Sequence, residues 1–220
     1  MPISRFKENL DLVQSQFTGV LRPSGFKRFG RTYNRTSADG LTQVINLQIH
    51  RPDPVPPQLR DQQAPAMHDR FTVNLGVWVP EVALHHRPAP RSQHIQEYDC
   101  QIRCRLGQLS TPPADIWWPL QDSWTESAAN ALRLLESGGL PFLEQFGTRD
   151  GILAGWLDRA PDSRILLAII EAVRGQLDRA RDLLEAQVAA TQNASHHHYV
   201  RAVASKLGLQ LGATPDSNGG

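Results

Sequence analysis

The chain has 220 residues, of which 40% are hydrophobic and 20% charged, and its formal net charge is +1. This length predicts one large domain or one domain with a helical appendage, and the composition is that of a soluble globular protein. Because the net charge is near zero, no overall field attracts nucleic acid or an anionic membrane, and we expect neither as a partner.

The hydropathy pattern also bears on location. No stretch approaches the roughly 20 apolar residues that a helix needs to cross a bilayer. The first seven residues lack the uninterrupted apolar core of a signal peptide. We therefore expect a cytoplasmic protein.

The chain begins with a predicted amphipathic helix over Ile3 to Val20. Its apolar residues recur at steps of three or four, at Phe6, Leu10, Val13 and Phe17. Gly19 and Pro23 then predict the end of the helix and a turn.

Four strands are predicted next, over residues 26–35, 41–50, 71–79 and about 95–106. Apolar and polar residues alternate in them, as expected of half-buried strands. Asp39-Gly40 predicts a hairpin between the first two, and proline-rich loops are predicted over 52–67 and 84–91. The order helix, strands, helices predicts an α+β fold with a four-stranded antiparallel sheet. The N-terminal and C-terminal helices are expected on its apolar face.

Two cysteines, Cys100 and Cys104, are expected on the apolar face of the fourth strand. Four residues of strand span about 13 Å, which exceeds the reach of a disulfide. We expect both to be reduced core thiols.

Helices are predicted from Thr125 onward. Two apolar runs over 125–146 are separated by Gly138-Gly139, and a helical pair over 165–188 is hinged at Gly175. We expect three parts: an α+β domain over 1–146, a helical extension over 147–210 packed on the same core, and a disordered tail over 211–220. A role of the helical pair in docking on another protein stays open.

Several short blocks recur in the order of a known family. They are Leu21–Lys27, Arg31–Tyr33, Val44–Gln48, Phe71–Val77, Arg103–Gly107 and Trp117–Trp118. Together they resemble the bacterial family known as domain of unknown function 4304, over roughly Ile3 to Phe146. The resemblance implies a bacterial, cytoplasmic α+β protein, and it supplies no activity, substrate or catalytic residue.

The alternation of the strands predicts one sheet face that carries amides, guanidinium groups and an indole. Such groups suit the recognition of a polar or anionic group. The tryptophans that follow are expected to cap an edge or end of the sheet, either as a packed corner or as a stacking surface. A solvated face, or one satisfied by carboxylates of a covering segment, is the alternative. The candidate ligand-binding residues are Asn46, Gln48, Asn74, Trp78, Arg103, Arg105, Trp117 and Trp118.

The signatures of catalytic and metal sites are missing from the sequence. It contains no glycine-rich phosphate loop, no Gly-x-Ser-x-Gly elbow and no His-Glu-x-x-His. His196 to His198 cannot all face one metal from a helix, because consecutive residues point about 100° apart. His85, His86 and His94 lack supporting Cys or carboxylate spacing. We expect no metal and no cofactor, and no catalytic residue is assigned.

A cluster of basic residues early in the chain is divided by the strand alternation between two faces. A nucleic-acid strip would need these residues on one face, so nucleic acid is not expected. The cluster comprises Arg22, Lys27, Arg28, Arg31 and Arg35.

Two functions remain from these observations. The first is a non-enzymatic binding module that holds a protein or a small anionic ligand on the polar sheet face. The alternative is an enzyme that acts on a polar or anionic small molecule, with the arginines as an anion clamp.

Overall fold

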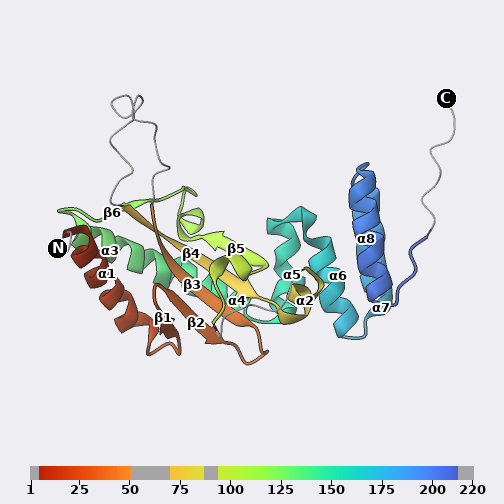
Figure 1. Ribbon diagram of the computed structural model, residues 1–220, viewed down its shortest axis with the longest axis horizontal. Coiled ribbons are helices and arrows are strands. Elements are labelled where there is room, and N and C mark those ends of the chain that lie inside the picture. Colours follow the sequence, from red (N-terminus) through yellow and green to blue (C-terminus); the bar gives the residue numbers. More distant parts are fainter. Residues whose placement is uncertain (1–4, 51–69, 87–93, 213–220) are drawn as a thin grey trace. The chain divides into compact units, whose positions relative to one another are not determined.

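The computed structural model describes residues 5–50, 70–86 and 94–212 (Figure 1). The chain forms two compact units, one over residues 1–78 and 90–148 and the other over 79–89 and 149–220. The chain therefore leaves the first unit after residue 78, contributes residues 79–89 to the second unit, and returns to the first unit at residue 90. The predicted packing of residues 147–210 on the core of the sheet domain stays a prediction.

The first unit contains an antiparallel sheet of six strands, which confirms the α+β prediction but exceeds the four strands expected. β2 to β4 pair in sequence order, β1 pairs with β2, and β5 and β6 both pair with β4. The strands are β1 (Lys27–Phe29), β2 (Thr32–Thr36), β3 (Thr42–Ile49), β4 (Arg70–Trp78), β5 (Ile102–Arg105) and β6 (Trp118–Pro119).

The first predicted strand is in fact a hairpin. Gly30 adopts φ +61°, a left-handed conformation that glycine takes without steric cost, and Phe29 pairs directly with Thr32. The turn has only two residues, so the alternation of side chains continues through it and conceals the reversal. The predicted hairpin at Asp39-Gly40 is confirmed, with Gly40 at φ +77°.

The fourth predicted strand is shorter than expected. Only Ile102–Arg105 pairs with β4, and Glu97–Asp99 forms a 3₁₀ turn. The predicted loop over 52–67 and the tail beyond residue 212 lie outside the described residues. Of the predicted irregular stretch over 84–91, the described part continues α2 as far as His86.

Three helices cover the apolar face of the sheet: α1 (Arg5–Leu21), α3 (Trp124–Leu134) and α4 (Leu140–Gln145) (Figure 1). Phe17 of α1 packs edge-on against Phe71 of β4, with ring centroids 6.5 Å apart. The buried amide of Gln43 donates to the carbonyl of Leu143, at 2.6 Å. Each fully buried Phe or Leu side chain contributes about 1.5–3 kcal/mol to folding.

The predicted break at Gly138-Gly139 is wrong, because the chain stays helical there. A π-helical turn, Leu135–Gly139, joins α3 to α4. A Cβ added at Gly139 would lie 2.7 Å from Leu135 Cδ1 and 3.0 Å from Leu106 Cδ1. The glycine is therefore needed for close approach to the 3₁₀ turn Leu106–Leu109, not for a break.

The second unit is helical, and its core is the apolar helix α6. Gly175, at φ +79°, lies between α6 and α7 and confirms the predicted hairpin. The guanidinium of Arg149 binds both oxygens of Glu81, at 2.7 and 2.9 Å, and so joins α5 to α2. The helices are α2 (Pro80–His86), α5 (Arg149–Arg159), α6 (Arg164–Val173), α7 (Leu177–Ala189) and α8 (Ala194–Lys206).

Within the described ranges, no helix combines the length and the apolar character required to cross a membrane.

Candidate binding face

The second face of the sheet is polar, and the strand register brings most of the candidate residues onto it. Directly paired residues of an antiparallel ladder share a face. Asn46 pairs with Asn74, Asn74 pairs with Arg105, and Gly76 pairs with Arg103. Six candidates share this face: Asn46, Gln48, Asn74, Trp78, Arg103 and Arg105.

Asn74 is the centre of a hydrogen-bond network across three strands. Its side chain donates from Nδ2 to Gln48 Oε1 at 2.7 Å and accepts from Arg105 Nε at 3.4 Å. Asn74 is only 6% exposed, so both bonds satisfy an amide that would otherwise be buried without partners. The network holds the Gln48 side chain in one orientation.

Arg105 continues this network to the segment before β6. Its Nη1 donates to Asp115 Oδ1 at 2.6 Å, and Trp117 Nε1 donates to Asp115 Oδ2 at 3.3 Å. The guanidinium carbon lies 5.2 Å from the centre of a Trp117 ring, within the range of a cation–π contact. The hydrogen bond from Arg105 lowers the pKa of the Asp115 carboxyl below its ordinary value.

Trp118 does not join this face, which corrects the expectation that both tryptophans belong to one site. It pairs in register with Phe71, its ring lies 5.6 Å from the Phe71 ring, and its Nε1 donates to Asn130 of α3 at 2.8 Å. The side chains of neighbouring strand residues point to opposite faces. Trp118 is therefore a core residue under α3, and Trp117 alone contributes to the polar face.

Residues 94–101 cross the polar face instead of extending β5. Asn34 exchanges two hydrogen bonds of 2.9 Å with the backbone of Ile95. A Cβ added at Gly76 would lie 2.6 Å from Cys100 Sγ. Cys100 therefore covers the polar face, whereas Cys104 pairs with Leu75 on the apolar face, so the prediction of both thiols on the apolar face is wrong for Cys100. Neither thiol forms a disulfide.

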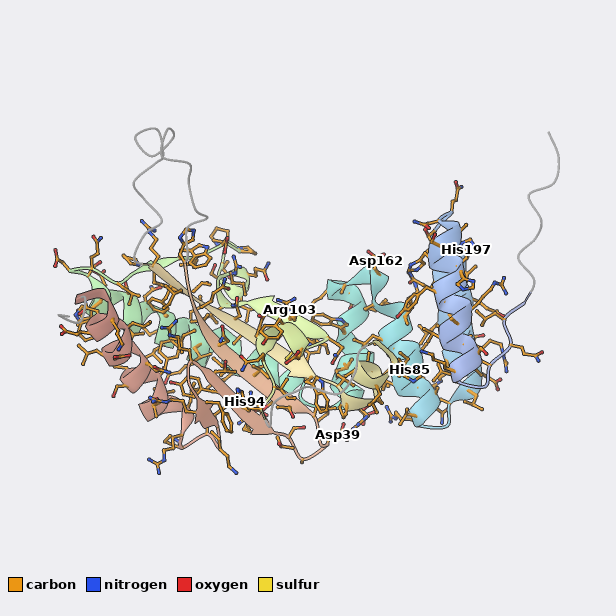
Figure 2. All side chains as sticks on the ribbon, in the orientation of Figure 1. Asp39, His85, His94, Arg103, Asp162 and His197 are labelled. Atoms are coloured by element: carbon orange, nitrogen blue, oxygen red, sulfur yellow. The ribbon has the colours of Figure 1, made fainter. Side chains whose placement is uncertain are left out.

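Arg103 and Trp78 lie on this face but outside the Asn74 network. Arg103, labelled in Figure 2, is 53% exposed in its side chain and donates from Nε to Glu97 Oε1 at 2.6 Å. Trp78 lines a separate hollow of about 580 Å³ that also includes Lys27, Thr36 and Thr42. For Arg103, the structure thus agrees with the alternative in which carboxylates of a covering segment satisfy the polar face.

A second hollow of about 480 Å³ opens on the polar face beside Asn46 and Gln48. Asn46 Nδ2 donates to Thr32 Oγ1 at 2.9 Å, and Thr32 Oγ1 donates to Gln96 Oε1 at 3.0 Å. Within the described ranges, Asn46 Oδ1 and Gln48 Nε2 have no hydrogen-bond partner. At the hollow, the Asn46 amide oxygen is thus available to accept a hydrogen bond, and the Gln48 amide nitrogen is available to donate one. Its lining comprises Phe29, Arg31, Thr32, Asn46, Leu47, Gln48, Ile49 and Gln96.

Sequence reasoning missed several residues of this face. Thr32 could have been found from the alternation of its strand, because it precedes the inward-facing Tyr33. Gln96 and Asp115 lie in non-repetitive segments, where no period indicates which way a side chain points. Their places depend on long-range contacts alone.

The histidines lie in different environments. His94 stacks on Phe29, with centroids 4.8 Å apart and an interplanar angle of 2°. His197 Nε2 lies 2.6 Å from the carbonyl oxygen of Thr191. Burial, reinforced by the Lys206 charge, lowers the pKa of His85. In the part of the chain that the structure describes, no three His, Cys, Asp or Glu side chains are placed to hold a metal ion. Figure 2 labels these three histidines.

Comparison with known proteins finds one family that part of the chain resembles. The chain matches no curated protein and no solved structure at a significant level. Residues 59–145 match the model described as "Domain of unknown function (DUF4304)", and this range includes Asn74, Arg103, Arg105 and Trp117 of the polar face. Residues 59–145 are therefore similar to the family known as domain of unknown function 4304.

Proposed function

We propose that the chain is a non-enzymatic binding module whose polar sheet face receives an amide-bearing group of a protein partner. The observation that carries the proposal is the pair of unpartnered amide atoms at the 480 Å³ hollow, Asn46 Oδ1 and Gln48 Nε2. The amides themselves are held by Thr32 and Asn74. Because the two amides are already held in place, little binding free energy is lost in ordering them when a ligand binds.

The spacing of the two amides suits an extended peptide. Asn46 and Gln48 are two residues apart on β3, so their backbones are separated by about 6.6 Å along the strand. A peptide group offers one N–H donor and one C=O acceptor, which complement the free acceptor and the free donor of the hollow.

The lining supports a protein partner more than a small molecule. Small-molecule pockets are mostly apolar with a few polar groups, whereas this hollow is lined chiefly by amide, hydroxyl and guanidinium side chains. Protein interfaces combine polar groups with aromatic and Arg side chains. Phe29 and Arg31, which also line this hollow, are of that kind.

The arginines support a neutral ligand. Arg103 is paired with Glu97, and Arg105 with Asp115. Each charge is therefore already compensated, which weakens the case for an anion clamp and with it the alternative of an enzyme on an anionic substrate. An anionic ligand would have to displace a carboxylate from either arginine.

Selection from a library of blocked extended peptides tests the proposal. Peptides enriched by the wild-type protein are expected to bind Gln48→Glu at least about tenfold more weakly, because the substitution replaces two donors by an acceptor of the same shape. Asn46→Asp, which removes the donor to Thr32 and adds a charge, is expected to weaken binding similarly.

Gln16→Glu is the matched control, since it adds the same charge at an exposed position of α1. Peptides that bind all four proteins equally, or a library without any enriched peptide, would refute the proposal.

A further inference from the structure

A third hollow lies on the other side of β1, between that strand and α1. Its volume is about 560 Å³. Lys27 and Arg28 are neighbours on β1 and point to opposite faces: Lys27 lines the hollow of Trp78, and Arg28 lines this one. The lining residues are Ser15, Thr18, Gly19, Arg22, Pro23 and Arg28.

The two arginines of the hollow come from different elements, Arg22 from the turn at the end of α1 and Arg28 from β1. The turn after α1 is closed by hydrogen bonds from Gly25 N to Arg22 O and from Phe26 N to Leu21 O, both 3.1 Å. Leu21 and Phe26 are buried at the two ends of this turn. Arg22 is thus held at the end of the helix, directly before the strand that carries Arg28.

Thr18, which lines the hollow, belongs to a hydrogen-bonded cluster. Thr18 Oγ1 donates to the carbonyl oxygen of Gln14 at 2.8 Å and lies 2.9 Å from the Tyr33 hydroxyl. Tyr33 is 1% exposed, and burial raises the pKa of its hydroxyl even though the Arg28 charge acts in the opposite direction. Because the Thr18 hydroxyl already donates its proton to the Gln14 carbonyl oxygen, it can only accept a hydrogen bond from a ligand. The donors of the hollow are therefore the side chains of Arg22, Arg28 and Ser15.

The two arginines of this hollow differ in their ion pairing from several other arginines of the chain. Arg35, Arg105 and Arg149 each bind a carboxylate. Arg22 and Arg28 make no ion pair with any carboxylate of the described residues, although both line one cavity. Both residues are exposed, so an anion can reach them from solvent.

We infer that this hollow binds a phosphate-type oxyanion, either free or carried on a small organic molecule. Guanidinium groups bind phosphate through paired, charge-assisted hydrogen bonds, and two of them match the charge of a dianion. The Ser15 hydroxyl supplies a further donor. The volume lies in the range of small-molecule sites, so an organic group can accompany the phosphate.

The helix dipole does not contribute to this affinity. The hollow lies beside the C-terminal end of α1, which carries the negative end of the dipole. Binding must therefore come from the guanidinium groups, and it is expected to depend on both of them.

Calorimetric titration with inorganic phosphate and with glycerol phosphate, at constant ionic strength, tests the inference. Saturable binding is expected for the wild-type chain and at least about tenfold weaker binding for Arg22→Gln and for Arg28→Gln. Tighter binding of glycerol phosphate would assign the site to organic phosphates, and equal binding would assign it to the free anion.

Two controls separate the site from general electrostatics. Lys27→Gln removes a charge from the adjacent strand position, and Arg133→Gln removes one from an exposed position of α3. Both are expected to bind within about twofold of wild type, because neither residue lines the hollow and solvent and salt screen charges outside it. An equal loss in these controls would overturn the inference, as would equally tight binding of acetate.

A further variant keeps both arginines. A Cβ added at Gly19 meets no atom within 4 Å, so Gly19→Glu places a carboxylate at the hollow without a clash. It is expected to abolish binding while circular dichroism stays as in the wild type and the midpoint of unfolding is not lowered. Undiminished phosphate binding by Gly19→Glu, or the lack of saturable binding by the wild-type chain, would refute the site.

Discussion

Trp117 and Trp118 are adjacent in the chain and belong to opposite faces of one sheet. Trp118 packs on Phe71 under α3, whereas Trp117 lies against Arg105 and His50 on the polar face. The alternation of strand side chains causes this division. A pair that resembles one aromatic site in the sequence thus consists of one core residue and one surface residue.

The two tryptophans should therefore differ in their contributions to stability. Trp118→Ala is expected to lower the free energy of unfolding by about 3–5 kcal/mol, because it leaves a cavity in the core beneath α3. Trp117→Ala is expected to lower it by less than about 1 kcal/mol, because that ring is half-exposed. Urea unfolding of the two variants measures both values, and equal losses would contradict the division between the faces.

Gly76 should be sensitive to the smallest enlargement. A Cβ at this position would lie 2.6 Å from Cys100 Sγ and 2.8 Å from Cys100 Cβ. Gly76→Ala is expected to lower the free energy of unfolding by about 1–3 kcal/mol, because the segment over 94–101 must move off the sheet. Urea unfolding at neutral pH measures the loss.

A double-mutant cycle identifies the cause of that loss. Cys100→Gly removes the two atoms that a Cβ at Gly76 would approach within 3.0 Å, so the double variant should be more stable than the sum of the two single effects predicts, by at least about 0.5 kcal/mol. Additive effects would show that Cys100 does not cover Gly76.

The ion pair between Arg105 and Asp115 should appear in the titration of the carboxyl. The hydrogen bond from Arg105 lowers the pKa of Asp115 in the folded protein relative to the unfolded chain. The pair therefore stabilises the fold above the ordinary pKa of 3.8, and this contribution is lost as the pH falls through the lower, folded pKa. Arg105→Gln is expected to raise the pKa of Asp115 toward its ordinary value.

Nuclear magnetic resonance gives two readouts of this shift. One is the carboxyl carbon of Asp115, and the other is the indole N–H of Trp117, which donates to the same carboxylate. Both signals should share one midpoint, and that midpoint should move upward in Arg105→Gln. An unchanged midpoint would mean that Arg105 does not hold Asp115 in solution.

Gly19 offers a stabilising substitution. It is an exposed residue of α1, and a Cβ there has open space around it. Gly19→Ala is expected to raise the free energy of unfolding by about 0.5–1 kcal/mol, because alanine loses less backbone entropy in a helix than glycine. Thermal unfolding should show a higher midpoint, and a lower one would indicate that the hollow beside α1 is narrower than described.

The segments with a regular hydrophobic period determined most of the fold by themselves. The alternation in residues 41–50 and 71–79 predicts both the strands and their faces, and the register confirms that Asn46, Gln48 and Asn74 share one side. Periodicity is sufficient there because a half-buried strand must place every second residue in the core. The helical pair around Gly175 was predictable for the same kind of reason, at a period of 3.6.

The tertiary structure alone decided how the polar face is covered and connected. Residues 94–101 alternate like a strand, yet they cross the face and place Cys100 on Gly76, because a glycine in β4 leaves room for them. The partners of Arg103 and Arg105 come from 3₁₀ and irregular segments, which have no period to predict them. Local patterning specifies which face a strand residue occupies, but long-range packing decides whether that residue meets solvent, a carboxylate or a ligand.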